Sequence, residues 1–279
     1  MKQLFDSVSQ ECSRLVTRSY STSFSLATKM LSVSIRKDIY NIYGFVRFAD
    51  EIVDSFHDYE KEFLFNRFSD DLELALKHKI SLNPILNSFQ ETYHKYNIDK
   101  SLVDAFMKSM RLDLYKTDYL TDEEFKAYIY GSADVVGLMC LKVFVNGDEK
   151  KYNDLKDTAM ALGSAFQKVN FLRDLKADFE GLNRTYFPNT DLKNLDENSK
   201  REIIDDIERD FEKGLSGIKK LPMEAKFGVF MAYRYYRQLL KKLKKTPALQ
   251  IKESRIRVSN PKKIELLMRS YVKYQLKLM

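Results

Sequence analysis

The sequence predicts an all-α fold, and three observations support that prediction. Apolar residues recur at spacings of three and four along most of the chain, and no stretch alternates for more than a few residues as a strand would. Only nine Gly and five Pro occur among 279 residues, so long helices with few tight turns are expected. Hydrophobic residues make up 44% of the chain, which is enough for a packed core.

Each predicted helix is a periodic apolar run that ends at a turn or breaker signal. Together the runs cover 33–56, 59–78, 82–96, 100–115, 122–146, 150–180, 198–219, 224–245 and 261–276. The breaks between them include Asn83-Pro84, Asn146-Gly147, an aperiodic loop over 181–194, Leu221-Pro222 and Thr246-Pro247. None of these breaks is a long Pro-, Gly- or Ser-rich linker, so we expect one helical domain over 1–279.

The formal net charge of +7 is unevenly distributed along the chain. The last 46 residues, 234–279, hold 14 Lys or Arg and two Glu, a net of +12, so residues 1–233 carry 7 − 12 = −5. A basic segment of this kind is either a solvated surface or a surface that meets an anion. The candidate anions are the phosphate groups of a substrate, acidic lipid and nucleic acid.

Several classes of protein are disfavoured by what the sequence lacks. Cys12 and Cys140 have no paired spacing, which argues against a disulfide framework and favours a reducing, cytoplasmic location. Asp6 stands where a signal peptide needs its apolar run, and Lys142 interrupts the densest apolar stretch, so neither secretion nor a membrane span is expected. The three histidines have no zinc spacing, and the glycine-rich fingerprints of nucleotide-binding proteins do not occur.

The helix predicted over 33–56 places polar residues beside its buried face. Its apolar stripe has spacings of 4, 3, 4, 3 and 4 and consists of Ile35, Ile39, Ile42, Val46, Ala49 and Val53. A second stripe lies about 100° further round the helix and consists of Tyr43, Arg47, Asp50 and Asp54. Two carboxylates one turn apart repel each other, and a bound cation would remove that repulsion.

The helix predicted over 150–180 repeats this arrangement. Beside an apolar stripe it carries a polar stripe of Gly163, Gln167, Asn170, Asp174 and Asp178. Carboxylate and amide oxygens without histidine or thiolate suit Mg²⁺, or Mn²⁺, better than zinc. The DxxxD spacing alone is weak evidence because it occurs five times, but the pairs 50/54 and 174/178 also have polar partners one or two turns earlier.

Small residues interrupt the helix predicted over 122–146, at Gly131, Ser132, Ala133 and Gly137. Each interior Gly costs a helix about 1 kcal/mol relative to Ala, so the missing side chains should serve a purpose. That purpose is either close packing of helices or room for a long ligand between them.

Five segments of the sequence form a recognisable set when they are taken together. They are Tyr20-Ser-Thr-Ser-Phe24, Tyr43 to Asp54, Tyr128 to Gly137, Gln167 to Asp178 and Asn183-Arg-Thr-Tyr-Phe-Pro188. The set resembles the squalene/phytoene synthases, the head-to-head isoprenoid synthases, and the likeness covers roughly 12–270. Two positions depart from the family pattern, because Asp134 stands where Gly is usual and Ser132 where Val is usual.

The resemblance implies a single-domain, isoprenoid-synthase-type helical bundle with a central cavity flanked by two Asp-rich helices. It also implies a prenyltransferase that condenses two prenyl diphosphates with Mg²⁺, or Mn²⁺, through a cyclopropylcarbinyl diphosphate. The favoured reaction joins two geranylgeranyl diphosphates to phytoene, in carotenoid biosynthesis, and no NADPH is expected. The alternative is a C30 enzyme that uses farnesyl diphosphate and gives dehydrosqualene or squalene.

The resemblance also assigns roles to individual residues. The expected Mg²⁺ ligands are Asp50, Asp54, Asn170, Asp174 and Asp178, and the four aspartates among them are the expected catalytic residues. The residues expected to bind or border the diphosphates are Tyr20, Ser21, Thr22, Ser23, Tyr43, Arg47, Gln167, Arg173, Tyr236 and Arg255. The C-terminal arginine is ambiguous between Arg255 and Arg257, and we favour Arg255.

A different class, a basic helical protein that binds nucleic acid or membrane through 234–279, would leave the two acidic stripes unexplained. We therefore expect prenyl diphosphates as ligands and no nucleic-acid partner. Because the product would be a long hydrocarbon, we expect a cytoplasmic protein that associates peripherally with the inner face of the membrane.

Overall fold

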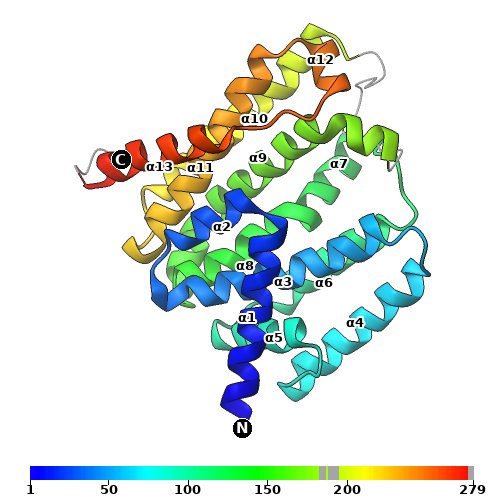
Figure 1. Ribbon diagram of the computed structural model, residues 1–279, viewed down its shortest axis with the longest axis vertical. Helices are drawn as coiled ribbons and strands as arrows, with labels where there is room; N and C mark the ends of the chain where they lie inside the picture. The colour runs from blue at the N-terminus through cyan, green and yellow to red at the C-terminus, as the bar shows by residue number, and fades with distance from the viewer. Residues whose placement is uncertain (182–186, 188–194, 276–279) are drawn as a thin grey trace.

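The structure is a computed structural model, and it describes residues 1–181, 187 and 195–275. Helices are the only regular elements of appreciable length among these residues, which confirms the predicted all-α class (Figure 1). In chain order they are α1 (Lys2–Tyr20), α2 (Thr22–Lys29), α3 (Val33–Ser55), α4 (Lys61–His78), α5 (Pro84–Lys95), α6 (Lys100–Leu112), α7 (Asp122–Ile129), the π-helical turn η1 (Tyr130–Asp134), α8 (Val135–Phe144), α9 (Glu149–Gly181), α10 (Glu197–Ile218), α11 (Met223–Lys245), α12 (Ala248–Glu253) and α13 (Asn260–Gln275).

Every predicted helix is present, but the apolar periodicity does not predict α1, α2 or α12. The reason is clearest in α1, whose buried residues are Ser9, Ser13 and Thr17. These small polar side chains hydrogen-bond within α1 and to α5, including a 2.7 Å contact between the hydroxyls of Ser13 and Ser88. A helix that buries a polar face does not show the apolar stripe that marks an ordinary amphipathic helix.

The helix predicted over 122–146 is one continuous helical run that changes its winding at η1. Close packing explains part of its glycine content. A Cβ on Gly131 would lie 2.9 Å from the carbonyl oxygen of Ala105 in α6, and a Cβ on Gly163 of α9 would lie 2.9 Å from that of Ala133. The small residues therefore let α6, η1 and α9 approach one another. Most of the predicted loop over 181–194 lies outside the described residues.

Several helices begin where a side chain caps the first free backbone N–H groups. Asn83 accepts hydrogen bonds from the N–H groups of Ile85 and Leu86 ahead of α5, with Pro84 in the first turn. Asp99, Thr121 and Asp196 cap α6, α7 and α10 in the same way. Because these groups have no partner within their own helix, the caps fix where each helix starts.

The core consists of two large apolar clusters. One lies among α3, α4, α5, α6 and α8, around the fully buried rings of Phe45, Phe89 and Phe106, with Phe45 stacked on Phe89 at 4.0 Å between centroids. The other lies among α9, α10 and α11, around Phe211. Figure 1 shows α9, α10 and α11 running together on one side of the molecule, with α1 lying across α3 and α5 on the other.

One helical run of the described chain, Asp122–Phe144, is long and apolar enough to cross a membrane by length and composition. Within the fold, 61% of its most apolar window is buried. Burial of this extent is typical of the core helix of a soluble protein, where apolar surface packs against neighbouring helices. The expectation that the chain does not span a membrane therefore remains a prediction.

Candidate active site

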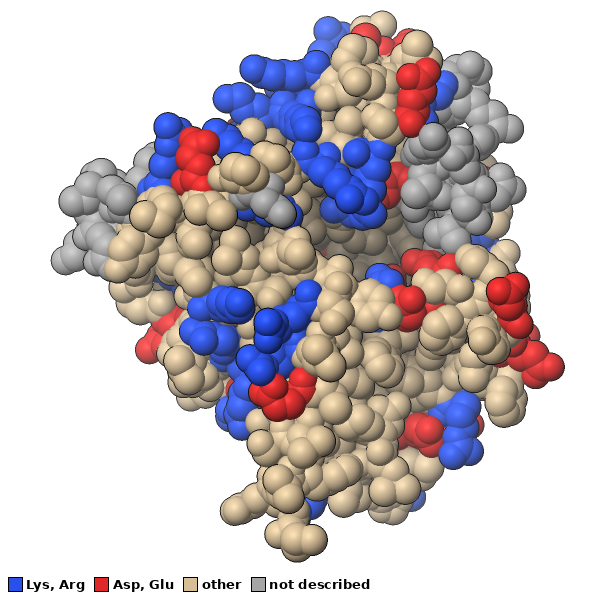
Figure 2. All heavy atoms as spheres, in the orientation of Figure 1, with Lys and Arg blue, Asp and Glu red and all other residues tan. Residues whose placement is uncertain are grey.

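A cavity of about 490 Å³ opens between the two core clusters. Its inner wall is mostly apolar and draws on both clusters, from Ile42 and Leu141 to Leu162 and Phe171. At its mouth lie ten of the residues that the sequence singles out, namely Tyr43, Arg47, Asp50, Asp54, Gln167, Asn170, Arg173, Asp174, Tyr236 and Arg255. Figure 2 shows a hollow on this face, with basic side chains on its upper rim and acidic side chains at its lower right.

Helix α3 supplies the first acidic face of the mouth, which comprises Arg47, Asp50, Glu51 and Asp54. Arg47 donates hydrogen bonds to the carboxylates of both Asp50 and Glu51. The ring of Tyr20 covers the Arg47 guanidinium at 4.5 Å, a cation–π contact that helps to hold it over α3. Burial alone would lower the pKa of Arg47, but Asp50 and Glu51 outweigh burial and raise it. One arginine thus contacts two of the three carboxylates on this face.

Helix α9 supplies the second acidic face, which comprises Gln167, Asn170, Arg173 and Asp174, together with Arg255. The Nε of Arg173 donates to Oδ1 of Asp174 at 2.9 Å. The Nε of Arg255 reaches the same oxygen at 2.7 Å, although the two residues are 81 positions apart. The Asp174 side chain is only 17% exposed. Two arginines therefore neutralise one carboxylate.

The structure separates Arg255 from Arg257, the two candidates that the sequence leaves open. Arg255 follows α12 and lines the cavity, where it contacts Asp174. Arg257 does not line the cavity, and its carbonyl oxygen accepts a hydrogen bond from Lys242 at 2.7 Å. In an extended segment, residues two positions apart lie on the same side of the chain. Arg257 therefore lies on the same side as Arg255 but further along the chain, beyond the cavity.

Two tyrosines add neutral hydroxyl groups to the mouth. Burial raises the pKa of Tyr43 to about 12, so its hydroxyl stays protonated near neutral pH and can donate to an anion. The hydroxyl of Tyr236 donates to Oδ1 of Asn170 at 3.3 Å, and its ring stacks on Phe166 at 4.1 Å between centroids. Each tyrosine is therefore held by packing on its ring while its oxygen faces the polar end.

The structure does not bring Ser21, Thr22 or Ser23 into the cavity wall. The Ser21 side chain accepts from the N–H of Phe24 at the start of α2 and hydrogen-bonds with Tyr43. The Thr22 hydroxyl accepts from Nζ of Lys263 at 3.0 Å, and Ser23 lines a separate small groove. The next residue of the motif, Phe24, is the one that reaches the cavity, where its ring stacks on Tyr43 at 4.6 Å.

The donor set at the mouth suits a hard divalent cation. Asp50 and Asp54 approach from α3, and Asn170 and Asp174 from α9, so every candidate ligand is an oxygen. Within the described part of the chain no three His, Cys, Asp or Glu residues cluster tightly enough to hold an ion by themselves. Asp178 lies in α9, but its side chain lies outside the described residues. The carboxylates are thus divided between two faces that a diphosphate could bridge.

The structure also shows a buried polar pair that periodicity does not reveal. The hydroxyl of Tyr128 donates to Oδ2 of Asp113 at 3.0 Å, and both residues line the otherwise apolar part of the cavity. Tyr128 further stacks with Phe171 at 6.0 Å between centroids. The sequence signal was weak, because Asp113 follows directly on α6 and belongs to no spaced pair.

Asp134, one of the two departures from the family pattern, points away from the cavity. It is 7% exposed, and one of its carboxylate oxygens accepts from the Ser164 hydroxyl of α9 at 2.7 Å. Burial raises the pKa of Asp134 to about 6. Its neighbour Ser132, the other departure, does line the cavity.

A family model described as squalene/phytoene synthase matches residues 17–262 of the chain. The chain belongs to the squalene/phytoene synthase family. It is a prenyltransferase of the phytoene/squalene synthase type. The match spans both acidic faces, the cavity wall and Arg255.

Individual members of the squalene/phytoene synthase family agree with this assignment. The chain is 26% identical over 275 residues to a 15-cis-phytoene synthase of Enterobacter agglomerans and spans 90% of that protein. It is 30% identical over 180 residues to the chloroplastic phytoene synthase 2 of Zea mays but spans only 44% of that longer protein. A crystal structure of a dehydrosqualene synthase superposes with a TM-score of 0.81 at 18% identity, covering 97% of this chain and 98% of that one. This last likeness shows the shared fold.

Proposed function

We propose that the protein condenses two geranylgeranyl diphosphates head to head to give phytoene. The observation that carries the proposal is one continuous cavity, whose mouth holds carboxylates from two helices and three arginines and whose interior is apolar. A prenyl diphosphate has the same division into an anionic head and an apolar tail. Similarity to 15-cis-phytoene synthase supports the C20 substrate.

The proposed reaction balances without a reductant. In the first half, one diphosphate leaves and the double bond of the second substrate attacks the allylic cation, which gives a cyclopropylcarbinyl diphosphate and one proton. In the second half, that diphosphate leaves, the carbon skeleton rearranges, and loss of a proton gives phytoene. The totals are two diphosphates and two protons released for each hydrocarbon formed.

The residues at the mouth would stabilise the departing diphosphate. Mg²⁺ or Mn²⁺ held by Asp50, Asp54, Asn170, Asp174 and, by the resemblance, Asp178 would neutralise negative charge on the leaving oxygens when bound. The guanidinium groups of Arg47, Arg173 and Arg255 would donate charged hydrogen bonds to the same group. The protonated hydroxyls of Tyr43 and Tyr236 would add neutral donors.

The cavity wall would keep water from an allylic cation. The stacked pairs Phe24–Tyr43 and Phe166–Tyr236 stand just inside the mouth, and Tyr128 stacks with Phe171 deeper in. Aromatic faces attract cations while they exclude water. In this proposal the same rings shield the intermediate and favour its positive charge.

One incubation tests the proposal. The purified protein is mixed with Mg²⁺ and either geranylgeranyl or farnesyl diphosphate, with and without NADPH, and the hydrocarbon is identified by mass and retention. We expect phytoene from the C20 substrate, at a rate that NADPH does not change. A C30 hydrocarbon from farnesyl diphosphate, with none from the C20 substrate, would establish the alternative and overturn the proposal.

A further inference from the structure

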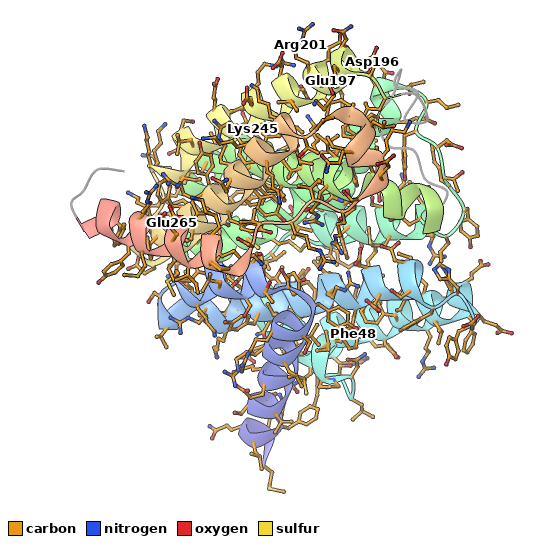
Figure 3. All side chains as sticks on the ribbon, turned by 45° about the horizontal axis from the view of Figure 1, so that its top comes forward. Phe48, Asp196, Glu197, Arg201, Lys245 and Glu265 are labelled. Carbon is orange, nitrogen blue, oxygen red and sulfur yellow. The ribbon has the colours of Figure 1, made fainter. Side chains whose placement is uncertain are left out.

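Three glycines that line the cavity lie together at one end of the helix pair α10 and α11. They are Gly214 and Gly217, late in α10, and Gly228, early in α11. The start of α10 meets the end of α11, because Lys200 donates to the carbonyl oxygen of Thr246 at 2.8 Å. Figure 3 shows the labelled Arg201 and Lys245 toward this end of the pair. The three glycines therefore lie at the opposite end, beside the turn that joins the two helices.

This end of the pair is distant from the mouth of the cavity, and we call it the far end. Thr158 of α9 lines the cavity there and precedes Asp174 by 174 − 158 = 16 positions. At 1.5 Å per residue, the two lie about 24 Å apart along the helix. Gly228 precedes Tyr236 by 236 − 228 = 8 positions, about 12 Å along α11. A prenyl diphosphate with its head at the mouth would extend its tail toward the far end.

Each of the three glycines forms a notch that receives a side chain from another part of the fold. The pairs are Gly214 with Leu162, Gly217 with Thr158, and Gly228 with Leu31. A Cβ on Gly217 would lie 2.0 Å from Oγ1 and 2.6 Å from Cβ of Thr158, and one on Gly228 would lie 2.4 Å from Cδ2 of Leu31. Carbon atoms in ordinary contact are about 3.5–4.0 Å apart. The notches therefore hold these side chains only because glycine has none.

The side chains held in the notches are themselves part of the cavity wall. Thr158 is fixed in its notch, since its hydroxyl donates to the carbonyl oxygen of Leu155 at 2.8 Å. Gly163 differs, because the three atoms nearest to a Cβ there are backbone atoms of Ala133 and Asp134. Gly163 thus lets two backbones approach, whereas the three notches take up side chains that would otherwise fill the far end of the cavity.

We propose that the three notches set the length of the prenyl chain that the cavity accepts. By taking up Leu31, Thr158 and Leu162, they leave the far end open for the last isoprene unit of a geranylgeranyl chain. A farnesyl chain is one isoprene unit shorter and does not need this space. The inference rests on the proposed function, because it names the residues that favour the C20 substrate at the same site.

Close packing of α9 against α10 is the alternative purpose of Gly214 and Gly217. If packing were their whole purpose, filling a notch would destabilise the fold and weaken the binding of both chain lengths alike. If the notches set chain length, the loss of binding falls on the longer chain. The two purposes therefore differ in the ratio of two affinities, which a general loss of stability does not change.

Binding of unreactive thiodiphosphate analogues of geranylgeranyl and farnesyl diphosphate tests the proposal without turnover. Thr158→Met introduces a longer side chain for which the notch at Gly217 has no room, so it must extend into the far end of the cavity. Calorimetry with Mg²⁺ should show the Kd of the geranylgeranyl analogue raised about tenfold and that of the farnesyl analogue changed less than about threefold. Gly214→Ala should shift the ratio of the two Kd values about threefold in the same direction, because Leu162 must give way.

Lys156→Met is the matched control, because it introduces the same side chain at an exposed position of α9 that does not line the cavity. It should leave the ratio of the two Kd values unchanged. Far-UV circular dichroism and thermal unfolding check that each variant folds, and Gly214→Ala decides the question if Thr158→Met does not fold.

The proposal is overturned if the ratio keeps its wild-type value in the folded notch variants, if both analogues weaken alike, or if the wild type binds only the farnesyl analogue. A shifted ratio in Thr158→Met, together with no phytoene from the wild type, would instead overturn the proposed function alone. Failure of the inference is thus distinguished from failure of the proposed reaction.

Discussion

The two acidic faces look alike in the sequence and differ in the folded chain. On α3, one arginine contacts two of three carboxylates, so the face keeps a net negative charge of two. On α9, Arg173 and Arg255 both contact Asp174, so the described part of that face is net positive. The first face therefore carries the larger negative charge with which to attract a cation. On the second face, Arg173 and Arg255 must first release Asp174, and an arriving diphosphate would offer them other anionic oxygens to bind.

Under the proposed function, this difference would couple the binding of metal and diphosphate on the α9 side. A diphosphate that took up the guanidinium groups of Arg173 and Arg255 would leave the Asp174 oxygens available to an ion. Without a diphosphate, the arginines would compete with the ion for the same oxygens. Coupling of this kind is reciprocal, because each ligand must strengthen the other by the same factor.

Both helices also bury polar contacts away from the mouth. On α3, the fully buried carboxylate of Asp38 accepts hydrogen bonds from Lys95 and Tyr96, each at 2.8 Å. On α9, Ser164 donates to Asp134, and Lys168 is paired with Asp206 and with Asp210, the latter at 2.8 Å. Because burial raises the pKa of Asp134 to about 6, the contact on α9 is the one that we expect to change near neutral pH.

The largest expected effect comes from removing a carboxylate on either face. Asp50→Asn and Asp174→Asn should each lower kcat at least about a thousandfold, because neutralisation of the leaving group is lost. Far-UV circular dichroism should show an unchanged helical signal. The matched control is Asp118→Asn with Asp122→Asn, a DxxxD pair outside the cavity, which should retain full activity. Substantial activity in Asp50→Asn or Asp174→Asn would remove the metal assignment.

A smaller effect should separate Arg255 from Arg257. Arg255→Gln should raise KM for the prenyl diphosphate about tenfold to a hundredfold, in line with the loss of one charged hydrogen bond. Arg257→Gln should change KM less than twofold because Arg257 lies off the cavity. Steady-state kinetics at saturating Mg²⁺ measure both values. The reverse ranking of the two variants would show that the assignment of Arg255 is wrong.

The polar support of α9 predicts a pH-dependent gain in stability from Asp134→Asn. The folded-state pKa of about 6 exceeds the ordinary value of 3.8, so folding favours the protonated carboxyl and loses stability as pH rises from 3.8 through 6. Removing the charge should therefore raise the free energy of unfolding by about 1–3 kcal/mol at pH 7.5 and by little at pH 4. Denaturant titrations at the two pH values measure the change. An equal change in the free energy of unfolding at both pH values would indicate that Asp134→Asn acts by altering packing and not by removing an ionised group.

The smallest effect tests the arginine competition directly. In calorimetry without substrate, Arg255→Gln should bind Mg²⁺ a few-fold more tightly than the wild type, because an ion pair of a half-exposed arginine is worth up to about 1 kcal/mol. With inorganic pyrophosphate present, the order should reverse. Arg47→Gln provides the comparison on α3. If Arg255→Gln weakened Mg²⁺ binding with and without pyrophosphate, the arginine would be a partner of the metal site and not its competitor.

The spacing of apolar residues could predict the helices that bury an apolar stripe. It placed α3 and α9 with their polar stripes, and those stripes do meet across one cavity. It missed α1, since the inward residues Ser9, Ser13 and Thr17 form hydrogen bonds within α1 and to α5 and carry no apolar signal. It also could not show that Ser21 and Thr22 are engaged by α2, Tyr43 and Lys263, because such contacts arise only when distant segments pack together.

The contact between Arg255 and Asp174 has a consequence for how the protein acquires activity during synthesis. A ribosome has already made α3 and α9 when residue 255 is still to come, and Arg255 must then close a loop of 81 residues to reach its partner. The bond between Thr22 and Lys263 closes a loop of 241 residues. Long loops are slow to close relative to local helix formation. The nascent chain can therefore form its acidic helices early, while the mouth of the cavity is completed only after nearly the whole polypeptide has emerged.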